Sequence, residues 1–413
     1  MANTLNFGNG KWGVQDGLAL AYNDENNNFK PLPFDFTRNS IGTYVDRDGL
    51  IKTASNNVPR VDFLDNADGA LLLEPARTNL IQYSDFTSVW TTPANITNNT
   101  VTSPQGIQNA NTLLKNGAYI ATSYILASGV ASGQIGVFSV FAKKNTTNIV
   151  GIRLASGSGA SDIRKNINLD TGEITDGAAG NQVGFISLEK EDFGNGWYRL
   201  KLKGTSSGSD NVCSLYAGEI GNTTNDGEIY IYGSQLEAGS YATSYIPTSG
   251  STVERVAEVC GLTQRVAGTI GQTEGVIYAE IDFKITDGVS GAWAISDNTS
   301  GSRITMNTVN NTSTTFTLSV AQNYQSGSTK LTSTNVTYSQ NHKVAIKYSG
   351  TTLKLFVDGI ETNSITTDGF GDYDKFYIGG NQTGLGSNRR KFIESKLYNT
   401  ALTDAELVIL TTI

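Results

Sequence analysis

The chain has 413 residues and a formal net charge of −8, with 30 Lys and Arg against 38 Asp and Glu. No cluster of Lys or Arg stands out, which argues against a nucleic-acid partner. No apolar run approaches the roughly 20 residues that cross a bilayer, so we expect no membrane insertion. One His and two Cys exclude a His-rich metal centre and a disulfide framework. Charged residues make up only 16% of the chain, and abundant Asn, Thr, Ser and Gly are typical of β-rich proteins with many turns.

Residues 1–36 are predicted to form a short leader. Turn-rich stretches such as FGNG and NDENNN alternate there with apolar patches that are too short to build a core. We expect this segment to attach the protein to a larger assembly, while the rest of the chain folds without it. The alternative is a flexible tail.

Residues 37–80 are predicted to form a β-hairpin connector. The sequence DRDG at positions 46–49 separates two strand-like runs, TYV and LIKT, which is a strong hairpin signal. Arg60 and Arg77 lie beside apolar runs, where a guanidinium can bind carbonyl or carboxylate oxygens. We therefore expect both arginines to be structural.

Residues 81–250 contain the first sizeable set of strands. IGVFSVFAKK is typical of a central strand, and GWYRLKLKG alternates its side chains with the period of two that marks a half-buried strand. Strands separated by turn clusters, without helical periodicity, predict an antiparallel sandwich or jelly roll. The polar segment after the last strand still carries Tyr241, Tyr245 and Ile246, and we expect these side chains to fold back onto this domain.

Residues 251–268 are predicted to be a linker, and residues 269–413 a second β domain with seven candidate strands. Its clearest hairpin turn is Asp358-Gly359, between TTLKLFV and IETNSI. Two such domains in tandem make this an all-β protein.

The only good helix signal is LTDAELVILTT near the C-terminus. Thr403 and Glu406 form a Ser/Thr-x-x-Glu capping box ahead of an apolar stretch. We expect Thr403 to cap this short helix, with Leu402, Leu407 and Leu410 turned toward the second sandwich.

Several strings resemble a segment of tailed-phage structural proteins, which forms a carbohydrate-binding-module-like jelly roll in fibres, spikes and capsid decorations. These strings are FDFTRNSIGTYVDRDGLIKTASNNVPRVDF, NINLDTGEIT, GWYRLKL and IYIYGSQLEAGSYATSYIPTSG. The strings GVIYAEIDFKI, HKVAIKYSGTTLKLFVDGIE and KLYNTALTDAEL resemble the concanavalin A-like or laminin-G-like lectin domains of similar phage proteins.

The resemblance implies a fold of two antiparallel β-sandwich (jelly-roll) domains in tandem, after a short N-terminal attachment segment and with one short C-terminal helix. It also implies a non-enzymatic virion protein that is assembled in the host cytoplasm, exposed on the particle, and adheres to host-surface or environmental glycans. Residues 1–36 would bind other virion proteins, and the chain would form a homotrimer. The alternatives are a purely structural fibre or capsid stabiliser and, less favoured, a polysaccharide depolymerase.

Sugar binding requires aromatic side chains that stack on a pyranose ring and polar groups that bind its hydroxyls. In the first sandwich the candidates are Trp90, Tyr119, Tyr124 and Tyr216. In the second they are Trp293, Asp297, Asn298 and Arg303. For each candidate, ordinary packing is the competing interpretation, and Trp197 is expected in the core because of its strand neighbours.

Two further features of the sequence bear on catalysis and on metal binding. Glu280 and Asp282 resemble part of the E-x-D-x-E strand of jelly-roll glycosidases, but Lys284 occupies the place of the second glutamate, so we expect no catalysis. The acidic loops 296–301 and 368–374 offer oxygen ligands for a structural Ca²⁺ ion, although such turns are common without metal. No other cofactor is expected.

Overall fold

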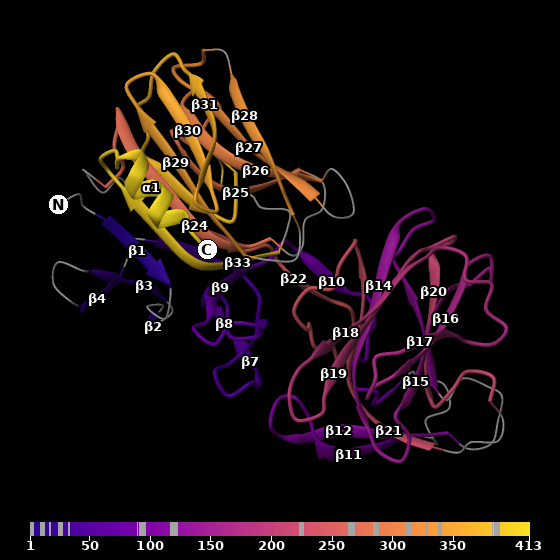
Figure 1. The fold of residues 1–413 in the computed structure, drawn as a ribbon. Coiled ribbons are helices and arrows are strands. Elements are labelled where there is room, and N and C mark those ends of the chain that lie inside the picture. The colour runs from indigo at the N-terminus through magenta and orange to yellow at the C-terminus, as the bar shows by residue number, and fades with distance from the viewer. Residues whose placement is uncertain are drawn as a thin grey trace. The chain divides into compact units, whose positions relative to one another are not determined.

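The computed structural model describes residues 4–8, 13–15, 18–23, 28–31, 34–88, 90, 96–115, 123–222, 227–262, 269–283, 289–310, 315–327, 329–337, 341–381, 383 and 389–413. The chain divides into two compact units. Unit 1 comprises Met1–Arg47, Thr53–Ala76 and Val256–Ile413, and unit 2 comprises Asp48–Lys52 and Arg77–Arg255. Both units consist of antiparallel sheets, and one short helix near the C-terminus completes the described part of the chain (Figure 1). The predicted all-β fold class is confirmed.

Unit 2 is a sandwich of two antiparallel sheets. The six-stranded sheet has the order β11 (Ile96–Thr102), β12 (Gln108–Lys115), β21 (Gly227–Ala238), β14 (Ile135–Lys144), β19 (Tyr198–Thr205) and β18 (Phe185–Asp192). The five-stranded sheet has the order β13 (Ser123–Ser128), β20 (Asp210–Ala217), β15 (Ile149–Ser156), β16 (Asp162–Asn168) and β17 (Ile174–Asp176). One face of each sheet contributes to a common core, in which Phe138 and Leu200 of one sheet join Ile152 and Leu215 of the other.

The segment after β21 folds back onto unit 2, as predicted. Tyr241, Tyr245 and Ile246 are 8%, 4% and 3% exposed. The Tyr245 ring contacts aromatic rings of β14 and β21, and its hydroxyl lies 2.8 Å from Oγ of Ser84. Arg77, in β10 (Arg77–Asn79), stacks on the Tyr241 ring, with 5.2 Å between its Cζ atom and the ring centroid. These contacts give the chain a fixed course before β22 (Val253–Arg255), which pairs with β10.

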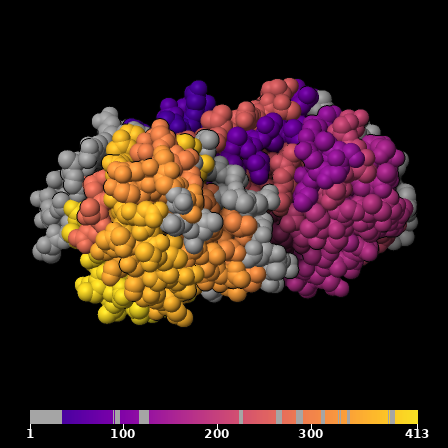
Figure 2. All heavy atoms as spheres, turned by 90° about the horizontal axis from the view of Figure 1, so that it is seen from above, coloured from indigo at the N-terminus to yellow at the C-terminus, as the bar shows by residue number. Residues whose placement is uncertain are grey.

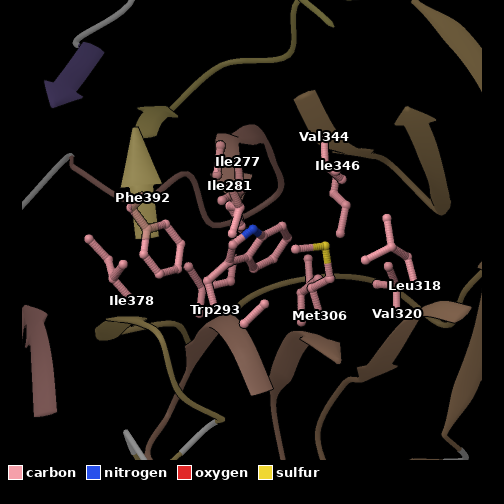
Figure 3. Packing of buried hydrophobic residues seen from close by; sticks show 14 of the residues in the cluster. Ile277, Ile281, Trp293, Met306, Leu318, Val320, Val344, Ile346, Ile378 and Phe392 are labelled. Carbon is pink, nitrogen blue, oxygen red and sulfur yellow. The ribbon is translucent and has the colours of Figure 1, made fainter. Parts of the chain in front are cut away.

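Unit 1 is a larger sandwich. Its eleven-stranded sheet has the main order β2 (Gly13–Gln15), β3 (Leu18–Asn23), β1 (Thr4–Gly8), β33 (Arg390–Tyr398), β24 (Glu274–Asp282), β29 (Asn341–Ser349), β30 (Thr352–Val357) and β31 (Ile360–Thr366), with β4 (Asn28–Pro31), β8 (Arg60–Asp62) and β9 (Ala70–Leu73) paired alongside. Its seven-stranded sheet has the order β28 (Lys330–Thr337), β27 (Thr315–Asn323), β26 (Arg303–Asn310), β25 (Val289–Ser296), β32 (Lys375–Ile378), β23 (Val259–Leu262) and β5 (Phe34–Thr37). Trp293, Met306, Ile346 and Phe392 lie in the core between these sheets (Figure 3).

The predicted leader contributes strands to unit 1. β1 pairs with β33 from Thr4↔Tyr398 to Gly8↔Glu394, and β5 pairs with β23. The expectation that residues 1–36 stand apart from the fold is therefore wrong. Their short apolar patches cannot build a core of their own, but they can extend sheets whose core is supplied by the rest of the chain.

The predicted connector is divided between several elements. β6 (Gly42–Val45) and β7 (Ile51–Ala54) form the expected hairpin around 46–49. β8 and β9 instead join the eleven-stranded sheet, where β9 pairs with β33. The sequence pattern located these strands but gave no information on their partners in the C-terminal part of the chain.

A buried cluster of two arginines and two glutamates connects the segment 38–76 with Glu258, which lies much later in the chain. Glu258 binds Arg38 at 2.6 Å and the Nε and Nη2 atoms of Arg60 at 2.8 and 2.5 Å, while Nη1 of Arg60 binds Glu74 at 2.9 Å. All four side chains are fully buried. Burial alone would lower the pKa of Arg60, but Glu258 and Glu74 raise it overall, so its guanidinium stays charged in this cluster. The structural role predicted for Arg60 is confirmed.

The helix α1 (Asp404–Thr411) begins with the predicted capping box. The Thr403 side chain accepts a hydrogen bond from the Glu406 amide, and the Glu406 side chain accepts one from the Thr403 amide. Leu407 is fully buried on the eleven-stranded sheet, and Leu402 and Leu410 pack against the same small core, as expected. The C-terminal residues also form part of the surface of unit 1 (yellow in Figure 2). Within the described residues, no helix is long and apolar enough to span a membrane.

Candidate functional site

The two tryptophans proposed as sugar platforms are core residues. Trp90 is 2% exposed, packs on Phe86 at 4.6 Å between ring centroids, and donates its indole N–H to the Tyr83 carbonyl at 2.9 Å. Trp293 is fully buried between the sheets of unit 1, with Met306 close by (Figure 3). Neither ring has a free face for a sugar, so this part of the expectation is corrected. Large aromatic side chains gain most from complete burial, and the sequence did not show which face of each sheet is covered.

The tyrosine candidates fall in unit 2. Tyr119 lies outside the described residues. Tyr124 belongs to β13, directly opposite Ser214 of β20, and its side chain is not among those described. Tyr216, also in β20, lies directly opposite Gly151 of β15. Tyr124 and Tyr216 therefore belong to neighbouring strands of the five-stranded sheet.

The face of this sheet that points away from the core carries several polar side chains that were not among the predicted site residues. Leu215, Ile152 and Ile163 point into the core, so the alternate residues of their strands point outward. The register places Ser214 opposite Arg153, and Arg153 opposite Arg164. We call the outward side chains of Ser214, Tyr216, Arg153, Asp162 and Arg164 the Arg153 face.

One carboxylate organises the two arginines of the Arg153 face. Asp162 accepts hydrogen bonds from Nε and Nη2 of Arg153 at 2.7 and 3.0 Å, and from Nε and Nη2 of Arg164 at 3.1 and 2.7 Å. Burial would raise the pKa of Asp162, but the hydrogen bonds and charges of the two arginines lower it, so the carboxylate is ionised at neutral pH. Like charges directly opposite each other on adjacent strands are destabilising, and Asp162 relieves this repulsion.

Tyr216 lies near these charges and is 6% exposed. Its pKa is raised overall, mainly by burial; the positive charges of Arg153 and Arg164 oppose this rise and Asp162 adds to it. A loop closes one side of the face: the Ile220 amide donates to Oδ1 of Asn166 at 2.8 Å. A Cβ atom on Gly151 would lie 2.6 Å from Cγ1 of Ile220, so only glycine lets the loop approach the sheet this closely.

The remaining candidates come together in unit 1, around the loop that follows β25. The Asp297 carboxylate accepts hydrogen bonds from the backbone and hydroxyl of Thr299 and from the backbone of Ser302, so it holds its own loop in shape. Asn298 has a left-handed backbone, with φ of 67°, and accepts a hydrogen bond from the Tyr377 hydroxyl at 2.9 Å. Arg303 begins the next strand, β26.

Arg303 donates from Nε to Oδ1 of Asn323 at 3.2 Å. Neighbouring loops also reach this end of the sandwich. Gln325 donates its backbone N–H to the Ser302 hydroxyl at 3.1 Å and its side-chain Nε2 to the Asp372 carboxylate at 3.5 Å. Gln325 thus links the acidic loop 368–374 to Ser302, which directly follows the loop 296–301. No group of three or more His, Cys, Asp or Glu side chains suited to a metal ion occurs among the residues that the structure places. A structural Ca²⁺ ion stays a prediction.

The carboxylates considered for catalysis lie on the eleven-stranded sheet. Glu280 is opposite Lys343 on one side and Glu394 on the other, and Asp282 is opposite Lys391. Burial and the nearby Glu394 raise the pKa of Glu280, while Lys343 and Lys396 lower it less. Glu394 is ion-paired with Lys396 at 2.9 Å. Glu280 therefore has a second glutamate opposite it, Glu394 of β33. The sequence motif did not reveal this glutamate, because the motif is read along one strand only.

Residues 283–408, in unit 1, match the family model described as the Concanavalin A-like lectin/glucanases superfamily. A search of the curated proteins found no match.

Three of the similar solved structures illustrate the range found. The CBM40 of the Ruminococcus gnavus IT-sialidase, bound to α2,3-sialyllactose, is 16% identical with a TM-score of 0.30, over 35% of this chain and 84% of that one. Domain 4 of AbnA, a GH43 extracellular arabinanase from Geobacillus stearothermophilus, in complex with arabinotriose, is 12% identical with a TM-score of 0.29, over 42% and 84%. A Bacteroides ovatus protein described as carbohydrate binding is 11% identical with a TM-score of 0.27, over 73% and 80%. Similarity at this level identifies no ligand for the present chain.

Proposed function

We propose that this protein is a non-enzymatic glycan-binding protein. The observation that carries the proposal is the Arg153 face, where two partly exposed arginines share one carboxylate, beside the largely buried Tyr216, on the side of the sheet that faces away from the core. The match of residues 283–408 to the Concanavalin A-like lectin/glucanases superfamily supports a carbohydrate ligand for unit 1.

The chemistry of the Arg153 face fits a sugar. A sugar ring has an apolar face and a rim of hydroxyls that both donate and accept hydrogen bonds. Arg153 and Arg164 can only donate, and Asp162 can only accept. The mutual hydrogen bonds of the charged groups fix their positions before a ligand arrives, which reduces the entropy lost on binding.

The biological setting is the finer part of the proposal. The sequence strings quoted above resemble phage fibres, spikes and capsid decorations, so we place the protein on the surface of a virion, as a homotrimer that adheres to host-surface or environmental glycans. Weak single sites suit this task, because many copies on one particle rebind at high effective concentration. The N-terminal residues would then contact other virion proteins through groups outside the sheet pairings of β1 and β5.

A glycan array probed with the full chain tests the proposal. Hits are titrated by calorimetry with the wild type, with Arg153→Met in unit 2 and with Asn298→Ala in unit 1, each shown by thermal unfolding to be folded. Loss of binding in only one variant assigns the site to that unit. Binding to no glycan would overturn the proposal, and shortened products after prolonged incubation with the bound glycan would overturn its non-enzymatic part.

A further inference from the structure

His342, the only histidine of the chain, is buried against the core of unit 1. It belongs to β29 and is 2% exposed, and its ring centroid lies 6.1 Å from that of Phe283 and 6.2 Å from that of Phe316. Its Nδ1 atom lies 2.6 Å from Oδ2 of Asp358, and its Nε2 atom lies 2.8 Å from the carbonyl oxygen of Thr337. Both ring nitrogens therefore have a hydrogen-bond partner inside the protein.

The chemistry of the two partners determines how the ring is protonated. A carbonyl oxygen and an ionised carboxylate can only accept a hydrogen bond, so each ring nitrogen has to donate. The second oxygen of Asp358 also accepts, from the Lys343 amide at 3.0 Å, as expected of an ionised carboxylate. A ring that donates from both nitrogens is an imidazolium, so a positive charge is buried beside the carboxylate of Asp358.

Asp358 is the charged group that contacts the ring, among the residues that the structure places. The other charged side chains on the surrounding strands lie elsewhere. Since side chains alternate along a strand and His342 faces the core, Lys343, Asp282 and Lys354 point to the other face of the eleven-stranded sheet. Lys330 lies at the far end of β28 from Thr337, and Arg390 stacks on Phe283 and binds Thr308.

The two hydrogen bonds of His342 connect the two sheets of unit 1. His342 and Asp358 belong to the eleven-stranded sheet and its β30–β31 turn, whereas Thr337 is the last residue of β28, an edge strand of the seven-stranded sheet. A second bond joins the same two sheets, from Nδ2 of Asn363 in β31 to the Ser333 carbonyl of β28 at 3.0 Å. The end of β28 is thus fastened to the opposite sheet by an imidazolium.

From this geometry we infer that His342 is a proton-controlled latch between the two sheets: as an imidazolium it holds the end of β28 through the Thr337 carbonyl, and as a neutral ring it releases that end. The proton that remains on the neutral ring stays on Nδ1, where the ionised Asp358 stabilises it. The lone pair of Nε2 then faces the Thr337 oxygen, and two acceptors do not bind each other. Thr337 is exposed, so its carbonyl can turn to water.

The direction of the switch follows from the same contacts. Burial lowers the pKa of His342, but the hydrogen bonds to Asp358 and Thr337 raise it overall. The latch is therefore closed at about pH 6.5, the ordinary pKa of histidine, and opens as the pH rises through the folded-state pKa.

NMR of the full chain with nitrogen-15 in the histidine ring tests the first half of the inference, because the single histidine gives unambiguous signals. We expect both ring nitrogens to be protonated at neutral pH, with a titration midpoint above about 6.5. Hydrogen exchange of peptides covering 330–337, corrected for its intrinsic pH dependence, tests the second half. Across the same midpoint these peptides should lose about tenfold or more of their protection, since a hydrogen bond to a charged group is lost. Peptides from unit 2 should not change.

Two variants separate the latch from a merely structural contact. Asp358→Asn removes the charge but keeps a residue that tolerates the left-handed backbone of this position, where φ is 50°. It should lower the midpoint of the ring and move the loss of protection in 330–337 to lower pH with it. Asn363→Ala, the matched control, removes the other bond to β28. It should weaken protection of 330–337 at every pH without moving the midpoint.

Several results would overturn the latch. These are a ring with one protonated nitrogen at neutral pH, a ring that titrates without a change in 330–337, and a ring that keeps both protons until the whole chain unfolds. Faster exchange at the turn 355–363 instead of 330–337 would also overturn it, because Asp358 rather than Thr337 would then be released. If Asp358→Asn does not fold, the titration and exchange of the wild type decide between these results.

Discussion

Helix α1 offers a direct test of how this small element is held. Leu407 is fully buried against Val276, Tyr278, Ala345 and Phe356. Leu407→Ala removes three carbons, worth about 2.4 kcal/mol at about 0.8 kcal/mol for each buried methylene. The cavity that remains adds to this, so we expect the free energy of unfolding of unit 1 to fall by about 2–5 kcal/mol.

Two further variants make the comparison quantitative. Thr403→Ala removes the N-cap, which typically costs about 0.5–2 kcal/mol, so its effect should be smaller. Ile409→Ala is the matched control, because Ile409 is 76% exposed on the same helix and its truncation should change stability by less than about 0.5 kcal/mol.

The assay is calorimetric unfolding of the full chain, with hydrogen exchange measured in peptides from β24 and β29 beneath the helix. Faster exchange there in Leu407→Ala, with Ile409→Ala unchanged, would confirm that the helix is part of the fold. The reasoning is refuted if Leu407→Ala leaves both measurements unchanged, or if Ile409→Ala is the more damaging substitution.

Three other predictions follow from buried ionisable groups. Glu258→Gln leaves two buried arginines short of a partner, so urea unfolding should show a loss of about 3–5 kcal/mol, and wild-type stability would contradict the buried network. Burial alone would lower the pKa of His342, but its hydrogen bonds to Asp358 and the Thr337 carbonyl raise that pKa overall. The stability that protonated His342 contributes is therefore complete below about pH 6.5 and is lost as the pH rises through the folded-state pKa. We expect His342→Asn to make the free energy of unfolding, measured from pH 6 to 9, depend less on pH. Burial raises the pKa of Cys213, and burial with the nearby Glu258 raises the pKa of Cys260 to about 12. Iodoacetamide should therefore label neither cysteine until denaturant is added, and mass spectrometry that finds labelled native protein would contradict this.

The sequence determined the elements more securely than their partners. Alternation of apolar residues, hairpin turns and the capping box are local signals, and they predicted the all-β class, α1 and many strands of residues 81–250 and 269–413 correctly. They missed β1 to β4 in the predicted leader, and β22 and β23 in the predicted linker 251–268. Pairing across hundreds of residues leaves no local signal, because any strand with a suitable face can extend a sheet. The sequence therefore gave no indication that β1 pairs with β33, or that Glu258 closes a charged cluster with Arg38 and Arg60.

The candidate site also combines features that the sequence indicated with features that only the tertiary structure determines. Residue type alone identified Tyr216, which lies near Arg153 and Arg164 but is only 6% exposed, and it also suggested Trp90 and Trp293, whose rings lie in the two cores. Which side of a strand faces the core depends on the second sheet, and that is a property of the tertiary structure. The Arg153 face depended on the strand register as well, because only the pairing of β15 with β16 brings Arg153 opposite Arg164 with Asp162 between their guanidinium groups. The sequence by itself determined the kind of surface that this protein could build, and the tertiary structure decided where its charges meet, since electrostatic interaction depends on distance in space rather than along the chain.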